Sequence, residues 1–249
     1  MRISQTSGIV LRTQNWRETS KLVTLYTEDF GKIKAIAKGL KVKKGKGTGG
    51  LGQFSENEII FYKKRNGLHL IDKWNFKDSN FALYGSFKKL VIASIMVEMV
   101  NKCVSGEERN PRLYGLLKSA LGLLGGGGDE KLFLASFMLH FLDNLGYKPH
   151  LGRCSRCKTE NFSGPLFFAL NKGSLTCGNC KTNRDRLVIV DREMKGVLEY
   201  LQNISVRKST RLKLMPLMQK KICDFLISFL TYTLDREIKS ISLLETAVA

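Results

Sequence analysis

The sequence has no hydrophobic run long enough to span a membrane. A spanning helix needs about 20 predominantly apolar residues, but the apolar segments LVIASIMV, LFLASFMLHFL and FLISFL are short and contain or end at polar residues. The first residues, MRISQTSGIVLRTQNW, also lack an apolar block followed by a small-residue cleavage site, which a secretory signal requires. We therefore expect a cytoplasmic protein without a membrane partner.

Acidic residues are scarce. The 249-residue chain holds 22 Asp and Glu against 41 Lys and Arg, which gives a formal net charge of +19. Solubility alone asks for a net charge of about 2 to 8 in a small domain. The surplus therefore indicates a polyanionic partner, with nucleic acid as the leading candidate. Hydrophobic residues make up 43% of the chain, which is sufficient for a folded core.

The motifs of several enzyme classes are missing. The sequence contains no G-x-x-x-x-G-K-[ST] phosphate-binding loop. Its carboxylates are dispersed, whereas a metal-dependent nuclease clusters them around the ion. A zinc deaminase would need an H-x-E motif beside its cysteine pair, and none is present. The sequence therefore favours a binding protein over an enzyme and offers no catalytic residue.

The first 80 residues are predicted to form strands. Asn66-Gly67 predicts a two-residue hairpin turn, because a type I′ turn needs positive φ at both central positions. Five short strands without an intervening helix are typical of a small closed barrel. The predicted strands are SGIVLRT, SKLVTLYT, GKIKAIAK, SENEIIFYKK and GLHLIDKW.

From Ser79 onward apolar residues recur at intervals of three and four, which predicts helices. Asn110, Asp129 and Asp191 are predicted to cap three of them, because short polar side chains satisfy the free N–H groups of a first turn. A last long helix is expected over about 216–238. The capped segments are PRLYGLLKSALGLL, EKLFLASFMLHFLDNL and REMKGVLEYLQN.

The order of these elements predicts an α+β protein of several domains. A β-barrel is expected at the N-terminus, followed by an all-α domain that is interrupted by a compact cysteine-containing insert. The predicted boundaries are 1–78 for the barrel, 79–147 and 188–249 for the two parts of the helical domain, and 148–187 for the insert.

The insert carries two C-x2-C pairs, CSRC and CGNC, separated by 19 residues. This spacing is typical of a zinc site with four cysteine ligands, and disulfides are not expected in a reducing compartment. Four protein ligands leave no open position on the ion, so we predict a structural Zn²⁺. His150 is the one alternative ligand. The predicted ligands are Cys154, Cys157, Cys177 and Cys180.

The longest run of positive charge begins on the third predicted strand. Alternation places Lys32, Lys34, Ile36 and Lys38 on one side of GKIKAIAK. The glycine-rich segment that follows adds lysines, and no acid appears before Glu56. We predict that this region binds nucleic-acid phosphates; a solvated connecting loop is the alternative. The predicted contacts are Lys32, Lys34, Lys38, Lys41, Lys43, Lys44 and Lys46.

A second stretch without acids lies between Glu199 and Asp224. Leucine and methionine side chains are interleaved there with arginine and lysine. We expect such a segment to offer a peptide-sized groove as well as a phosphate-binding patch.

Four segments in this order resemble the RecO family of bacterial recombination mediators. They are SGIVLRTQNWRETSKLVTLYTEDFGKIKAIAKGLK, NPRLYGLLKSALGLL, LHFLDNLGYKPHLGRCSRC and CGNC. The resemblance implies that the barrel is an OB-fold and that the insert is a zinc ribbon. It also implies association with the nucleoid, binding of single- and double-stranded DNA, strand annealing, cooperation with RecR, and replacement of single-strand-binding protein (SSB) by RecA.

The resemblance further implies that the helical domain binds the acidic and hydrophobic C-terminal tail of SSB. Such a tail needs apolar contacts and a cation for its terminal carboxylate. The acid-free stretch offers both at Arg211, Leu212, Lys213, Leu214 and Met215.

Two other functions fit parts of the sequence. An RNA- or ribosome-associated zinc-ribbon protein would share the charge and the cysteines, and competition between matched DNA and RNA oligonucleotides would distinguish it. A metal-dependent nuclease would cleave labelled DNA in the presence of Mg²⁺.

Overall fold

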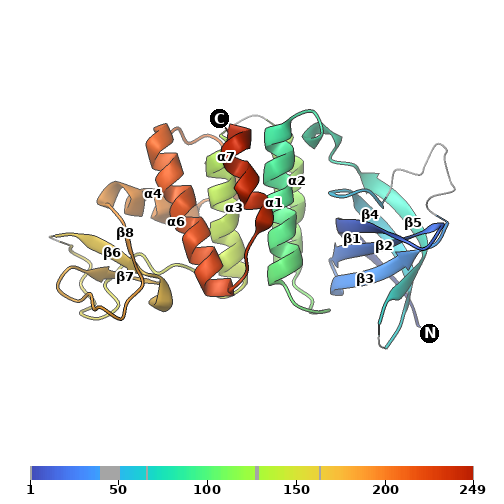
Figure 1. Cartoon of the computed structure of the whole chain (residues 1–249), viewed down its shortest axis with the longest axis horizontal. Helices are drawn as coiled ribbons and strands as arrows, with labels where there is room; N and C mark the ends of the chain where they lie inside the picture. Colours follow the sequence, from blue (N-terminus) through green and yellow to red (C-terminus); the bar gives the residue numbers. More distant parts are fainter. Residues whose placement is uncertain (1, 40–50, 66, 127–128, 163, 249) are drawn as a thin grey trace. The chain divides into compact units, whose positions relative to one another are not determined.

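The structure is a computed structural model that describes residues 2–39, 51–65, 67–126, 129–162 and 164–248 (Figure 1). The chain forms two compact units. The first comprises Met1–Gly126 together with Ile238–Ala249, and the second comprises Gly127–Glu237. No helix in the described part of the chain is long and apolar enough to cross a membrane.

The first unit begins with a closed five-stranded barrel in the order β1-β2-β3-β5-β4. The ring closes because β1 pairs with β2 along its second half and with β4 along its first. All pairs are antiparallel except β3 with β5. This confirms the predicted barrel. The strands are β1 (Arg2–Trp16), β2 (Ser20–Thr27), β3 (Gly31–Ala37), β4 (Glu56–Lys63) and β5 (His69–Asp78).

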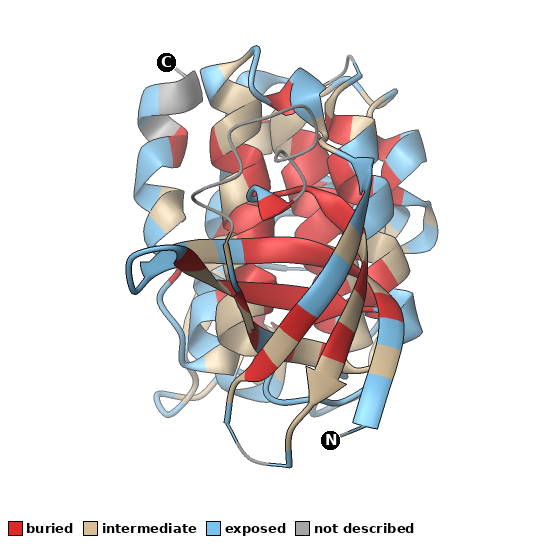
Figure 2. Cartoon of the chain, turned by 90° about the vertical axis from the view of Figure 1, so that its right-hand side faces the viewer, coloured by how far each residue is buried: buried red, intermediate tan, exposed pale blue. Residues whose placement is uncertain are grey.

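The barrel interior follows the predicted alternation. Ile33, Ala35 and Ala37 on β3 are buried in the core, while Lys34 and Lys38 are exposed. On the other strands the buried residues also line the barrel interior (Figure 2), but the alternation is less regular, and five consecutive residues of β2, Val23–Thr27, are all buried. Because successive side chains of a strand point to opposite faces, one face of β3 fills the core and the other carries the charge.

The β4–β5 hairpin forms, but its connection is longer than predicted. The last pair is Tyr62 with Leu70, and this register does not fit a two-residue turn at positions 66 and 67; Asn66 itself lies outside the described residues. The backbone N–H of Lys64 donates to Nδ1 of His69 at 3.2 Å. The buried imidazole therefore satisfies an amide that a tighter turn would have paired within the ladder.

Two capped helices follow the barrel in the first unit, α1 (Phe87–Cys103) and α2 (Pro111–Leu124), after a short helix η2 (Phe81–Leu83). The predicted cap of α2 is confirmed, because the side chain of Asn110 accepts a hydrogen bond from the N–H of Leu113 at 3.0 Å.

The last residues of the chain return to α1 through η4 (Lys239–Ile241) and α7 (Ser242–Val248). Glu98 of α1 accepts hydrogen bonds from the backbone of Lys239 and from Ser240, and it pairs with Lys102 at 2.7 Å. Burial opposes ionisation of Glu98, but these contacts together lower its pKa to about 2. The predicted helix over 216–238 was too long, and α7 was not predicted.

The barrel is fixed to α1 and α2 by contacts from both sides. The ammonium of Lys32 donates to the main-chain carbonyls of Asn101 at 2.6 Å and of Val104, at the C-terminal end of α1. On α2, Tyr114 and Lys118 bind the buried Glu56 at 3.0 and 2.8 Å. Cations near a helix C-terminus are stabilising because they neutralise its free carbonyls.

The second unit combines helices with a small sheet in the order β7-β6-β8. Phe168 of the sheet packs edge-on against Phe225 and Phe229 of α6. The predicted caps Asp129 and Asp191 are confirmed at α3 and α4. The elements are α3 (Glu130–Asn144), β6 (Leu166–Ala169), η3 (Leu170–Lys172), β7 (Ser174–Cys177), β8 (Leu187–Ile189), α4 (Arg192–Asn203), α5 (Val206–Ser209) and α6 (Pro216–Leu234).

We expect Gly31→Ala to destabilise the barrel strongly. Gly31 has φ +62, and a Cβ there would lie 2.2 Å from the carbonyl oxygen of Glu108. The matched control is Gly39→Ala, because Gly39 has φ +72 and, among the described residues, no atom lies within 4 Å of the added Cβ. Backbone strain alone costs about 1 to 2 kcal/mol.

Urea unfolding followed by tryptophan fluorescence measures this difference, because both tryptophans of the chain, Trp16 and Trp74, lie in the barrel. A steric clash adds to the strain, so Gly31→Ala should lower the free energy of unfolding clearly more than Gly39→Ala. Equal losses would show that the loop at Glu108 yields without cost.

Candidate metal centre and nucleic-acid interface

Four cysteine sulfurs converge in the second unit. Cys154 and Cys157 lie in the turn after Leu151, Cys177 ends β7, and Cys180 follows in the next turn. Their Sγ atoms all lie within 4.8 Å of one another, with Cys177 at 3.9 Å from Cys154 and 3.8 Å from Cys157. A tetrahedral ion with Zn–S bonds of about 2.3 Å requires sulfurs about 3.8 Å apart. The four predicted ligands therefore fit one metal ion.

Backbone hydrogen bonds shape this site. Two tight turns place N–H groups near the sulfurs, and the N–H of Cys177 donates to Sγ of Cys154 at 3.5 Å. Although burial favours the neutral thiol, hydrogen bonds from the backbone of Cys177, Arg156 and Cys157 lower the pKa of Cys154 to about 6. Hydrogen bonds with Cys177 and Cys157 raise the pKa of Cys180 to about 12. Binding of a divalent cation requires the cysteines to lose their protons, so such binding would depend on pH.

His150 does not take part in the cluster. Among the residues that the structure describes, the group whose donor atoms come together is formed by the four cysteines alone. They could hold a metal ion, with four protein ligands and no open coordination position.

The predicted basic row on the barrel divides into two parts. Lys34 and Lys38 are exposed and have no hydrogen-bond or ion-pair partner among the described residues. Lys32 instead binds the end of α1, and burial, with some repulsion from Lys34, lowers its pKa. We therefore reassign Lys32 from phosphate binding to a structural role.

The sequence analysis did not identify the residues that lie beside Lys34 and Lys38. Ile36 pairs in register with Leu22 on β2 and with Leu70 on β5, so three half-buried apolar side chains lie side by side between Lys34 and Lys38. Exposed Arg65 lies in the β4–β5 connection. The strand 2–3 face and the 4–5 loop are the surfaces that OB-folds use for oligonucleotides. The charge run KKRNG was the available signal for Arg65.

The other predicted contacts fall into two groups. Lys41, Lys43, Lys44 and Lys46 lie outside the described residues. Arg211 and Lys213 are exposed in the connection between α5 and α6, beside the half-buried Leu212 and Leu214. Met215 is 76% exposed.

Comparison with known families covers nearly the whole chain. The model for the N-terminal part of recombination protein O matches residues 1–80, and the model for its C-terminal part matches residues 85–241. The chain belongs to the RecO family. It is therefore a DNA repair and recombination protein, as the resemblance of its sequence segments predicted.

Curated relatives of this RecO family member support the assignment over similar lengths. A DNA repair protein RecO from Pelotomaculum thermopropionicum is 30% identical over 98% of this chain and 94% of the relative. One from a Thermoanaerobacter species is 30% identical over 83% of this chain and 86% of the relative. One from Desulforamulus reducens is 27% identical over 96% of this chain and 93% of the relative.

We expect protein purified without added metal to contain one zinc ion per chain by elemental analysis. Cys154→Ser and Cys177→Ser should lose it, whereas Cys103→Ser, outside the cluster, should retain it. Acid should release the ion, because thiolates must be deprotonated to bind it. Removal should lower the melting temperature of the second unit; unchanged melting of metal-free protein would contradict a structural role.

We expect substitution of the exposed Lys34 and Lys38 to change DNA binding and substitution of Lys32 to change stability. Lys34→Gln with Lys38→Gln should flatten the slope of log K against log[salt] for single-stranded DNA by about 1.4, since each lost phosphate contact removes about 0.7. Lys32→Gln should lower stability and leave the slope unchanged. Salt titrations of oligonucleotide binding, with urea unfolding alongside, measure both. An unaltered slope in the double variant would remove this face from the DNA interface.

Proposed function

We propose that this protein is a DNA-binding recombination mediator. It anneals complementary strands and, together with RecR, helps to load RecA onto single-stranded DNA that is coated with SSB. It acts on single- and double-stranded DNA in the cytoplasm, in association with the nucleoid. It breaks no covalent bond.

The observation that carries this proposal is the open basic face of the barrel. Lys34 stands on β3, whose inner side is packed in the barrel core, and Lys38 directly follows the last residue of that strand. Neither lysine has a hydrogen-bond or ion-pair partner among the described residues. Its positive charge is therefore not neutralised by a carboxylate in that part of the chain. Unpaired cations on a rigid surface bind a phosphate backbone by releasing its counterions.

Annealing follows from charge neutralisation. Two DNA strands repel each other through their phosphates. A protein that holds both strands lowers this repulsion, and base pairing then supplies the free energy of the product. No nucleotide hydrolysis is needed, and a structural Zn²⁺ with four thiolate ligands would not offer a coordination site to a substrate.

The segment 211–215 is the proposed contact for the SSB tail. Arg211 and Lys213 form no ion pair within the described part of the chain, and the neighbouring side chains are apolar. Met215 and Leu217 are exposed by 76% and 68%. Exposed methionine and leucine beside cations can take an acidic, hydrophobic peptide, because apolar burial and charge pairing then act together.

The decisive experiment is annealing of SSB-coated complementary oligonucleotides with and without this protein. We expect acceleration that weakens as salt rises, because phosphate binding is screened and entropically opposed by added counterions. No acceleration at any salt concentration would leave the mediator function without support. Matched RNA oligonucleotides provide the competing substrate.

The tail contact is tested in the same assay with Arg211→Glu, Lys213→Glu. This variant should lose more of its acceleration on SSB-coated strands than on bare strands. Arg184→Glu, Arg186→Glu is the control with the same charge change elsewhere in the second unit. If both variants behave alike on coated strands, the tail binds elsewhere.

A further inference from the structure

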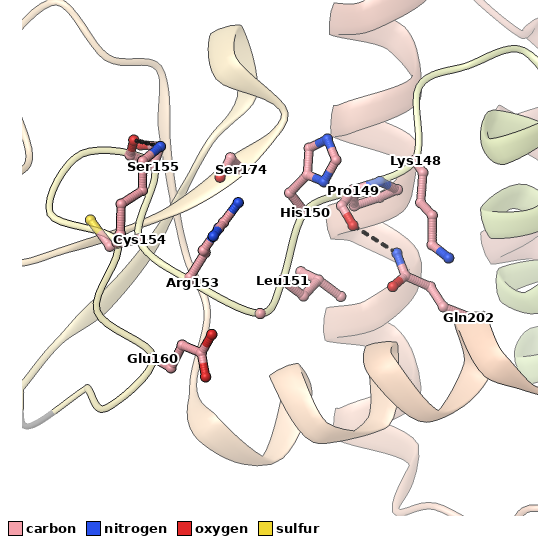
Figure 3. Close-up of a pocket in the computed structure, with 12 residues that line it drawn as sticks. Lys148, Pro149, His150, Leu151, Arg153, Cys154, Ser155, Glu160, Ser174 and Gln202 are labelled. Atoms are coloured by element: carbon pink, nitrogen blue, oxygen red, sulfur yellow. Dashed lines mark hydrogen bonds between the residues drawn. The ribbon is translucent and has the colours of Figure 1, made fainter.

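A pocket of about 520 Å³ lies in the second unit beside the cysteine cluster (Figure 3). It is built from residues of the segment 148–160, from β7 and from the last turn of α4. The side chain of Gln202 donates to the carbonyl of Pro149 at 2.9 Å. The backbone of His150 pairs with Ser174 of β7. Its walls are therefore tied to two regular elements and are held in place before any ligand arrives.

The pocket has an excess of positive charge. Its lining carries three cations, Lys148, Arg153 and Lys158, against one carboxylate, Glu160. In the part of the chain that the structure describes, the side chains of Lys148 and Arg153 have no hydrogen-bond or ion-pair partner. The ammonium of Lys158 donates to the carbonyl of Ser155 at 2.9 Å, which leaves its charge uncompensated.

Arg153 is directed into the pocket and away from the single acid. Its guanidinium points toward His150 and Ser174, whereas Glu160 lies on the other side of the Arg153 backbone (Figure 3). Because Arg153 does not pair with Glu160, the N–H donors of its planar guanidinium stay available to a ligand. That geometry matches the oxygens of a phosphate in a bidentate fashion.

The lining favours phosphate over an apolar peptide. Its apolar members include Pro149 and Leu151, and both are buried. A hydrophobic tail would therefore find little apolar surface to cover, whereas a charged and hydrogen-bonding group meets cations and the hydroxyl of Ser174.

We propose that this pocket binds a phosphate group of single-stranded nucleic acid. The inference rests on the proposed function and deepens it, because annealing requires a second strand contact besides the barrel. It assigns that contact to Lys148 and Arg153, which belong to the other unit of the chain. The role of the metal centre is then to hold the segment that carries Arg153, one residue before the first cysteine ligand.

The test compares three full-length double variants in oligonucleotide binding at several salt concentrations. Lys148→Gln with Arg153→Gln removes the pocket cations. Arg184→Gln with Arg186→Gln removes two exposed charges from the same unit but outside the pocket lining. Lys34→Gln with Lys38→Gln tests the barrel. Zinc content and circular dichroism confirm that each variant is folded.

We expect the pocket variant to flatten the salt slope by about 1.4 on single-stranded DNA, for two lost phosphate contacts, and the Arg184, Arg186 control to keep the parent slope. A parent slope in the pocket variant overturns the inference. If the barrel variant loses slope in that case, the proposed function still stands. If the parent binds no DNA, the proposed function itself fails.

Two further arms identify the source of the phosphate. Oligonucleotides with a 5′-phosphate or a 5′-hydroxyl distinguish a strand end from an internal phosphodiester, and either result agrees with the inference. Competition by inorganic phosphate should weaken binding to the parent more than binding to the pocket variant. If instead an acidic peptide with a free carboxylate binds the parent and loses affinity in the pocket variant, while DNA does not, the pocket serves a protein partner and the inference is wrong.

Discussion

Repulsion among the basic side chains is the constraint under which this protein folds. The chain has 41 Lys and Arg against 22 Asp and Glu. An acid therefore stabilises the fold most where it binds groups from a second structural element. Glu56 joins the barrel to α2, and Glu98 joins α1 to the returning C-terminal segment. Glu107 joins the strands β4 and β5 to the loop after α1 through Lys63 and His69. These three acids are therefore paired with basic or hydrogen-bonding groups of other elements and do not neutralise Lys34 or Lys38 on the barrel surface.

This arrangement also sets the behaviour in acid. Hydrogen bonds from Lys172 and then Thr182 lower the pKa of Asp185 to about 2, and contacts with Lys102 and Ser240 do the same for Glu98 against the effect of burial. A carboxylate whose folded pKa is depressed contributes stability above its unfolded pKa of about 4, and this contribution is lost as pH falls toward 2. Acid therefore weakens the contacts of Asp185 with Lys172 and of Glu98 with the returning C-terminal segment.

The sequence predicted those features that neighbours along the chain determine. The caps at Asn110, Asp129 and Asp191 were predictable because an N-cap is satisfied by the first turn of its own helix. The convergence of the four cysteines was predictable because two C-x2-C pairs at this spacing are typical of one metal site. The alternation on β3 followed from strand geometry alone.

Features that depend on distant partners were not predictable in this way. Nothing near Lys32 reveals that its ammonium meets carbonyls at the end of α1, about 70 positions further along, so it was grouped with Lys34. The parallel pairing of β3 with β5, which brings Leu70 beside Ile36, also needs the closed barrel. The same holds for the pocket at Arg153, whose walls come from three separate segments.

The return of the C-terminal segment to α1 has a consequence for synthesis on the ribosome. The second unit, Gly127–Glu237, is inserted between the two parts of the first. Ile238 and Leu244 are buried, so a nascent chain that has completed both the barrel and the second unit still lacks part of the packing around α1. The first unit therefore begins to emerge before the second but is completed after it, because the segment that packs on α1 is synthesised later than the second unit.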